Sequence, residues 1–307
     1  MKIFLQLIRF PNLLIVALTQ ALIYFIVFFP NFRAIGVSPD LNVFHLGLLI
    51  FSTICIAAGG YIINDILDLE IDQINKPEKT IIGNQISIKR ASQLYGLSIL
   101  IGFIISLYLA IKTNNLPLLS LYPIAVFLLY LYSKYFKKSV LVGNIIVSLF
   151  CAFVAGIIWV AERNTFLILQ QKNEEAADHL QFVLWIYLGF AFLATMFREI
   201  VKDLEDQEGD RIGNCRTLPI VAGTSTAKII AFLFGIALFV MLAYLFQTLI
   251  TLDRKLALLF LMLTLFSPLL YSFHLLRKAK LPNDFHRISQ LAKIMMLMGL
   301  ILLFLIA

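Results

Sequence analysis

The chain has 307 residues, of which 61% are hydrophobic and 14% are charged, and its formal net charge is +7. Soluble globular domains are usually about 25% charged, so this composition excludes a soluble protein and indicates a chain that folds in lipid. In such a chain an excess of Lys and Arg is typical of cytoplasmic loops beside anionic headgroups, and it does not indicate nucleic-acid binding.

Nine apolar runs, each about long enough to cross a bilayer as a helix, follow one another along the chain. The first run is too long for the hydrophobic region of a signal peptide, so we expect it to remain in the protein. The sequence therefore predicts an all-α, polytopic membrane protein with about nine transmembrane helices, forming a single domain over residues 1–307. The predicted spans are about 11–30, 42–63, 91–111, 116–133, 139–161, 181–200, 227–249, 256–276 and 290–307.

The distribution of positive charge predicts how these spans are oriented. With a cytoplasmic N-terminus, the segments on the inner side hold roughly three times as many Lys and Arg residues as those on the outer side, as the positive-inside rule requires. The two longest inner loops are then residues 64–90 and 201–226, and they also carry most of the acidic residues. We expect an integral protein of the cell inner membrane, with the N-terminus and both acidic loops in the cytoplasm.

The first acidic cluster begins where the second span ends. Asn64, Asp68 and Asp72 are spaced at i, i+4 and i+8, so on a helix they would form one polar stripe. Carboxylates at this spacing destabilise a helix unless a cation lies among them. Lys79 follows Asp72 at a distance of seven residues.

The second acidic cluster follows the sixth span. Asp203, Asp206 and Asp210 are spaced at i, i+3 and i+7, again on one helical face, and Arg216 follows Asp210 six residues later. Each half of the chain thus offers carboxylates followed by a cation. A Mg²⁺-bridged diphosphate needs this arrangement, because Mg²⁺ takes oxygen ligands from one or two carboxylates, water and phosphate, while Lys and Arg neutralise the remaining charge.

A second interpretation is that these are solvated loops, whose acids cap helix ends and balance nearby Lys and Arg. Two clusters at helical spacing, both on the same side and both starting at the end of a span, favour the metal interpretation. The twelve-residue calcium loop with a central Gly and a terminal Glu is absent, and so is the phosphate-binding loop of ATP-driven enzymes. The clusters therefore predict Mg²⁺ as the cofactor and a diphosphate as the ligand.

These motifs resemble those of the UbiA superfamily of intramembrane prenyltransferases, and the resemblance covers nearly the whole chain. It implies a bundle of nine helices and transfer of an isoprenoid chain from a Mg²⁺-bound diphosphate to an acceptor. Within the superfamily, the sequence of the second motif is most similar to that of the digeranylgeranylglyceryl phosphate synthases. The motifs that carry the resemblance are Asn64-x₃-Asp68-x₃-Asp72 with Asn75-Lys76-Pro77, Tyr132-Ser133-Lys134, Gly143-Asn144, Arg198-Glu199-x₂-Lys202-Asp203-x₂-Asp206-x₃-Asp210, and Arg216-Thr217-Leu218-Pro219.

The reaction needs metal ions and cations to stabilise the departing diphosphate, and the residues of the two acidic loops and their neighbours can supply them. We expect the catalytic acids to be Asp68, Asp72, Asp206 and Asp210, which together with Asn64 would bind two Mg²⁺ ions, with Asp65 and Asp203 supporting them. The residues expected to bind the substrate are Lys76, Lys79, Tyr132, Lys134, Lys202, Arg211 and Arg216. The cations among these would hold the diphosphate, and Tyr132 would face the allylic cation.

The acceptor is less determined than the donor. The expected partners are a polyprenyl diphosphate donor, a lipid or aromatic acceptor, and membrane lipids. By the resemblance, the donor is geranylgeranyl diphosphate. Geranylgeranylglyceryl phosphate is the preferred acceptor, and an aromatic acceptor of quinone biosynthesis is the alternative. An ion-coupled transporter is the alternative of another class, since acids near helix ends also build ion pathways.

Overall fold

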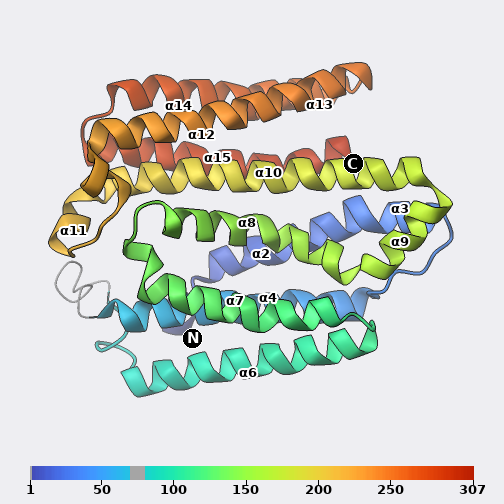
Figure 1. The fold of residues 1–307 in the computed structure, drawn as a ribbon, viewed down its shortest axis with the longest axis horizontal. Helices are drawn as coiled ribbons and strands as arrows, with labels where there is room; N and C mark the ends of the chain where they lie inside the picture. The colour runs from blue at the N-terminus through green and yellow to red at the C-terminus, as the bar shows by residue number, and fades with distance from the viewer. Residues whose placement is uncertain (1, 70–79) are drawn as a thin grey trace. The chain divides into compact units, whose positions relative to one another are not determined.

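The computed structural model describes residues 2–69 and 80–307, and its regular elements there are helices (Figure 1). In chain order they are α1 (Lys2–Leu7), α2 (Phe10–Leu22), the π-helix η1 (Ile23–Phe28), α3 (Phe29–Ala34), α4 (Val43–Leu67), α6 (Ile88–Lys112), α7 (Leu116–Lys134), the 3₁₀-helix η3 (Phe136–Lys138), α8 (Val142–Ala161), α9 (Arg163–Lys172), α10 (Glu174–Glu205), α11 (Gln207–Ile212), α12 (Leu218–Thr251), α13 (Lys255–Leu261), the π-helix η4 (Met262–Phe266), α14 (Ser267–Lys278) and α15 (Pro282–Ile306).

Within the described residues, nine helical segments are long and apolar enough to cross a membrane, which confirms the predicted all-α polytopic fold. The sixth and ninth begin earlier than predicted, at Glu174 and Pro282, because the helix continues through polar residues beyond the apolar run. The seventh segment begins at Leu218, but its backbone is not helical at Gly223 (φ 83°, ψ 157°), where a kink separates the first residues of α12 from the rest of the span. Many large apolar side chains remain exposed on these helices, as expected for surfaces that face lipid.

The chain divides into two compact units. Unit 1 comprises Met1–Tyr24, Phe32–Lys137 and Ile157–Lys172, and unit 2 comprises Phe25–Asn31, Lys138–Gly156 and Asn173–Ala307. The first acidic cluster belongs to unit 1 and the second to unit 2. The prediction of one domain over residues 1–307 stays a prediction.

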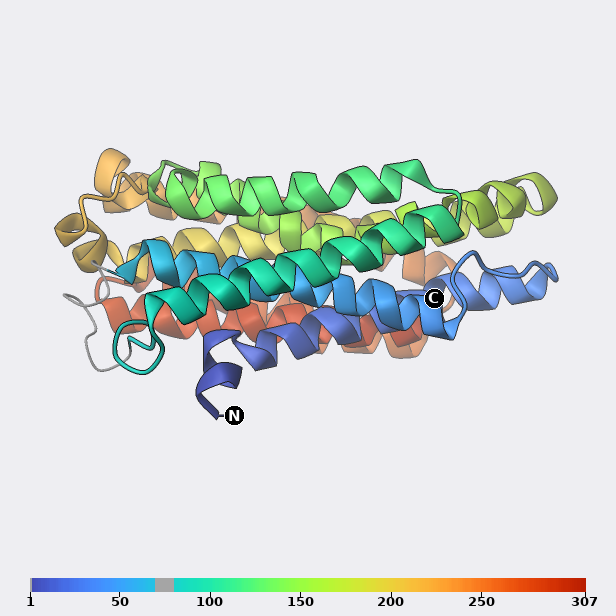
Figure 2. The same cartoon turned by 90° about the horizontal axis from the view of Figure 1, so that it is seen from below.

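Unit 1 is built on α4, which packs against α2, α6 and α7 (Figure 2). The helices come close together because small residues line their interfaces: a Cβ on Gly102 of α6 would lie 2.3 Å from the hydroxyl of Tyr122 on α7 and 2.9 Å from Cβ of Cys55 on α4. Near the last turn of α4, a buried apolar cluster that includes Leu7 and Ile62 packs α1 against α4. The end of α4 that carries Asp68 is therefore held in place by tertiary contacts.

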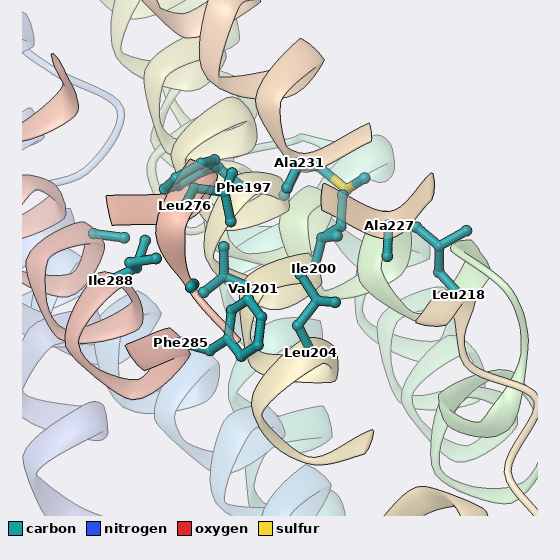
Figure 3. Close-up of a cluster of buried hydrophobic side chains, with 13 residues drawn as sticks. Phe197, Ile200, Val201, Leu204, Leu218, Ala227, Ala231, Leu276, Phe285 and Ile288 are labelled. Atoms are coloured by element: carbon teal, nitrogen blue, oxygen red, sulfur yellow. The ribbon is translucent and has the colours of Figure 1, made fainter. Parts of the chain in front are cut away.

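Unit 2 is built on α10, which packs against α12 and α15, while α14 packs against α15. Figure 3 shows the buried cluster near the last turns of α10, where Phe197 and Val201 meet Ala231 of α12 and Phe285 of α15. All four side chains are almost completely buried. This packing fixes the end of α10, from which the second acidic cluster continues.

The contact between α10 and α15 depends on a glycine. A Cβ at Gly299 would lie 2.1 Å from Cε1 of Phe190 and 2.5 Å from its Cζ. We therefore expect Gly299→Ala to lower the free energy of unfolding by about 1–3 kcal/mol, because the ring must move in a packed interface. Gly96→Ala is the matched control, since nothing lies within 4 Å of its added Cβ. Thermal unfolding in detergent measures both, and equal melting temperatures for the two variants would contradict the prediction.

At the end of unit 1 opposite Asp68, a buried carboxylate holds the loop before α4. Glu162 is fully buried, and its two oxygens accept the backbone N–H groups of Asp40 and Leu41, both at 2.9 Å. Thr165 and Asp40 complete the link, because the N–H of Asp40 also donates to Oγ1 of Thr165 and the N–H of Thr165 donates to Oδ2 of Asp40. The sequence gives no local signal for this contact, because the partners are more than 120 residues apart.

This carboxylate makes unit 1 sensitive to pH. Burial raises the pKa of Glu162 from 4.5 to about 7, since the loss of solvent outweighs the backbone donors, which favour the ionised form. The folded chain then binds more protons than the unfolded chain between these two values, so stability falls as the pH rises through that window. We expect a loss of at most about 3 kcal/mol between pH 5 and 8.

Glu162→Gln tests this expectation, because it removes the titration and keeps one oxygen acceptor. The melting temperature of the variant should change less than that of the wild type between pH 5 and 8. Parallel profiles for the two proteins would show that Glu162 is not the titrating group.

Candidate active site

The first acidic cluster begins at the C-terminal end of α4. The helix stops at Leu67, and Asp68 caps it, with its backbone N–H bonded to the carbonyl of Asn64 at 3.0 Å. The side-chain amide of Asn64 also donates to Oδ2 of Asp68 at 2.9 Å. The predicted i, i+4 spacing thus brings these two polar side chains together.

Lys137 also reaches Asp68, although 69 residues separate them in the sequence. Its Nζ donates to the same Oδ2 and forms an ion pair with it. Asp68 is only 5% exposed, and a buried carboxylate without a compensating cation would be strongly destabilising. The ion pair with Lys137 therefore balances the buried charge of Asp68.

Asp65 faces a different partner. Its Oδ1 accepts from the guanidinium of Arg9 at 2.9 Å, and this guanidinium also lies over the ring of Tyr61, 4.7 Å from the ring centroid. Arg9 has a left-handed backbone, with φ of 51°, at the turn between α1 and α2. Asp65 therefore ties the N-terminal helices to α4, and the sequence prediction did not anticipate Arg9 in this role.

The second acidic cluster lies at a break between two helices. α10 ends at Glu205, Asp206 forms the junction with φ of −88° and ψ of 4°, and the short α11 begins at Gln207 (Figure 1). The predicted single helical face through Asp203, Asp206 and Asp210 is therefore divided between α10 and α11. A break at Asp206 turns the chain where a continuous helix would stack like charges one turn apart.

The turn after α11 holds Asp210 in place. Oδ2 of Asp210 accepts from the hydroxyl of Thr217 at 3.0 Å, and its carbonyl accepts from the N–H of Cys215 at 2.9 Å. The N–H of Arg216 donates to the carbonyl of Lys138 at 2.8 Å, which ties this turn to the segment before α8. The Arg216-Thr217 pair quoted from the sequence thus has a structural role: Thr217 orients Asp210.

Asp203 bonds to Asn144. The side-chain amide of Asn144, near the start of α8, donates to Oδ2 of Asp203 at 2.8 Å, and Ser148 continues the polar face of α8 one turn further along. This contact connects the Gly143-Asn144 motif with the second acidic cluster. It agrees with a supporting position for Asp203 beside Asp206.

The other predicted substrate-binding residues that the structure describes differ in exposure and in their contacts. Lys202, Arg211 and Arg216 are exposed around the second cluster. Lys134 is also exposed, but its Nζ lies over the rings of Tyr130 and Tyr135, 5.6 and 5.1 Å from their centroids. Tyr132 is partly buried near the end of α7. Asp72, Lys76 and Lys79 lie outside the described residues.

The described acidic and amide side chains of the two clusters carry the kind of ligand atom that Mg²⁺ prefers. Asn64, Asp68, Asp206 and Asp210 offer oxygen atoms, which hard divalent cations prefer. Among residues 2–69 and 80–307, no three His, Cys, Asp or Glu side chains lie close enough together to enclose a metal ion by themselves.

Comparison with known proteins agrees with this description. The UbiA prenyltransferase family model matches residues 22–300. Digeranylgeranylglyceryl phosphate synthase of Sulfolobus acidocaldarius is 33% identical over 78% of this chain and 76% of its own length. A structure solved in work on digeranylgeranylglyceryl phosphate synthase in membranes has a TM-score of 0.71 at 25% identity, covering 99% of this chain and 97% of that one.

A third relative shows the same fold at lower identity. The structure of a UbiA homologue from Archaeoglobus fulgidus bound to DMAPP and Mg²⁺ has a TM-score of 0.56 at 17% identity, covering 98% of each chain. The length of the family match and the identity to the Sulfolobus synthase confirm the resemblance noted in the sequence. This chain belongs to the UbiA prenyltransferase family and is a membrane prenyltransferase.

Proposed function

We propose that this protein transfers a geranylgeranyl group from geranylgeranyl diphosphate to the free hydroxyl of geranylgeranylglyceryl phosphate, in a Mg²⁺-dependent reaction. The observation that carries this proposal is the 33% identity to a digeranylgeranylglyceryl phosphate synthase over 78% of the chain. The motif Arg198-Glu199-x₂-Lys202-Asp203 and the Thr217 contact with Asp210 support it from within this chain.

Two groups of residues would hold the metal ions. Asn64, Asp68 and Asp72 would bind one ion and Asp206 and Asp210 the other, with Asp65 and Asp203 supporting the two groups. When bound, Mg²⁺ neutralises the charge that develops on the departing diphosphate. Prenyl diphosphate and Mg²⁺ are bound together by the Archaeoglobus homologue, and this supports the same pairing here.

The chain supplies further positive charge around the diphosphate. Lys76, Lys79, Lys134, Lys202, Arg211 and Arg216 are the proposed cations, and the contact of Lys137 with Asp68 adds a seventh. Asp68 would hold the metal ion, and Lys137, which lies beside it, would neutralise charge on a phosphate oxygen. Tyr132 would offer its ring to the allylic cation.

The proposal includes a position in the cell. The nine apolar helices and the family establish an integral membrane protein. We infer that the N-terminus and both acidic loops lie in the cytoplasm of a cell bounded by this membrane, because Lys and Arg gather in the loops on that side. A water-soluble acceptor headgroup and a diphosphate would then reach the acids from the cytoplasm, with their prenyl chains in the lipid.

The experiment is an acceptor comparison. Purified protein with Mg²⁺ and radiolabelled geranylgeranyl diphosphate is given geranylgeranylglyceryl phosphate, 1,4-dihydroxy-2-naphthoate or 4-hydroxybenzoate in parallel. We expect diphosphate release and an ether product with the glycerophosphate alone. Turnover of only the aromatic acceptors would replace the proposed substrate, and transport without diphosphate release would overturn the proposed reaction.

A further inference from the structure

An ion pair lies inside the membrane-spanning part of α10. Nη1 of Arg198 donates to Oε1 of Glu199, and the side chains are 26% and 17% exposed. Glu199 stands six residues before the end of the helix at Glu205, which corresponds to about 9 Å of helix. A carboxylate inside a membrane helix raises the free energy of the folded protein in the bilayer, and such residues usually mark a functional site.

The carboxylate of Glu199 shares a polar face with the second acidic cluster. Asp203 follows one helical turn later, and Glu199 lies close enough to interact electrostatically with it. It also interacts with Cys151 on α8, the helix whose Asn144 binds Asp203. The polar face thus continues from the metal-binding end of α10 toward the membrane interior, between α10 and α8 of unit 2.

Neither metal binding nor diphosphate binding uses this carboxylate. A negative charge near the diphosphate would repel it, and the metal ligands proposed in this unit are Asp206, at the junction after α10, and Asp210, on α11. Arg198 compensates the charge of Glu199, so the pair costs less to bury than a lone carboxylate would. It leaves the second carboxylate oxygen, Oε2, outside the ion pair.

The proposed reaction requires a group that accepts a proton from the acceptor hydroxyl. The bond between C1 of the donor and the diphosphate oxygen breaks, and its electron pair leaves with the diphosphate. The acceptor hydroxyl oxygen then forms the ether bond to C1, and its proton must be taken up. With the diphosphate at the end of α10, as proposed, C1 and the prenyl chain would extend toward the membrane interior, the direction in which Glu199 precedes Asp203 by one turn.

We propose that Glu199 is the catalytic base that takes the proton of the acceptor hydroxyl as the ether bond forms, and that Arg198 positions the Glu199 carboxylate. This inference rests on the proposed function. An aliphatic hydroxyl is a weak nucleophile, so a carboxylate beside it favours capture of the allylic cation by the acceptor over capture by water. Glu199 therefore determines the partition between ether and prenyl alcohol.

Glu199→Gln tests this base, because the amide keeps the shape of the side chain and cannot accept the proton. We expect ether formation to fall by about 100-fold or more. Diphosphate release should fall by less than about tenfold, because water captures the cation and geranylgeraniol accumulates. Glu199→Asp keeps a carboxylate one methylene shorter, and it should form the ether at least about ten times faster than Glu199→Gln does.

Glu205→Gln is the matched control. Glu205 lies on the same helix, its side chain is 23% exposed, and it pairs with His286 of α15 instead of facing α8. We expect its ratio of ether to geranylgeraniol to equal that of the wild type. Donor binding, measured with a non-reactive thiodiphosphate analogue, shows whether each variant is folded.

Three results would overturn the assignment. The first is ether formation by Glu199→Gln within about threefold of the wild type, and the second is a parallel fall of ether formation and diphosphate release, which a structural or binding role would cause. The third is a folded Glu199→Asp protein that forms the ether no faster than Glu199→Gln does. Failure of the proposed function would appear in the wild type itself, as an absence of ether with geranylgeranylglyceryl phosphate, and the assignment of Glu199 would fall with it.

Discussion

Asp68→Ala and Asp206→Ala should each lower the rate of prenyl transfer by about 1,000-fold or more, while the protein still inserts into the membrane. Among the described acids of the first cluster Asp68 is the most buried, and its Oδ2 accepts hydrogen bonds from Asn64 and Lys137. Asp206 forms the junction at which α10 gives way to α11. Both carboxylates are proposed metal ligands, so either substitution should weaken the stabilisation of the departing diphosphate.

Asp178→Ala is the control for both variants. Asp178 is an exposed acid near the other end of α10, so its loss should leave turnover within about twofold of the wild type. The rate of diphosphate release at saturating Mg²⁺ measures the effect, and thermal unfolding confirms that each variant is folded. A folded Asp68→Ala or Asp206→Ala protein that keeps its activity would refute the metal assignment at that residue.

Lys137→Ala should have the second largest effect, a fall in turnover of about 100-fold. Lys137 is the lysine that reaches Asp68, so it is placed to neutralise phosphate charge beside the metal ligand. Lys134 extends from the same segment, but its Nζ lies over Tyr130 and Tyr135. Lys134→Ala should therefore reduce turnover less than Lys137→Ala does.

Lys137→Arg separates the charge from the geometry. It keeps a cation near Asp68, and turnover should recover at least about tenfold relative to Lys137→Ala. Initial rates over a range of donor concentrations report the comparison. The assignment of the two lysines would be reversed if Lys134→Ala lowered turnover more than Lys137→Ala did and Lys137→Ala kept near wild-type activity.

Hydropathy and spacing predicted the parts of this protein that depend on nearby residues. The apolar runs predict the nine spans because a membrane helix must satisfy its own backbone and carry apolar side chains over its whole length. The spacing of Asn64 and Asp68 predicts their contact because one helical turn separates them.

The sequence could not predict contacts that depend on tertiary packing. The partners of Asp68 and Asp65 are Lys137 and Arg9, which are 69 and 56 residues away. Positive charge near a span end has the same appearance in a sequence whether it sets topology or reaches an acid. The break at Asp206 was missed for a related reason, since i, i+3 and i+7 spacing describes a continuous helix and an interrupted one equally well.

We propose that Asp68 and Asp206 both contribute to the Mg²⁺-dependent binding of one prenyl diphosphate. A double-mutant cycle with Asp68→Ala and Asp206→Ala, measured as Mg²⁺-dependent binding of a non-reactive geranylgeranyl thiodiphosphate, tests it most directly. We predict that binding requires Mg²⁺ and that the two substitutions are non-additive by more than about 1 kcal/mol. Binding that persists without Mg²⁺, or effects that add to within about 0.5 kcal/mol, would contradict it.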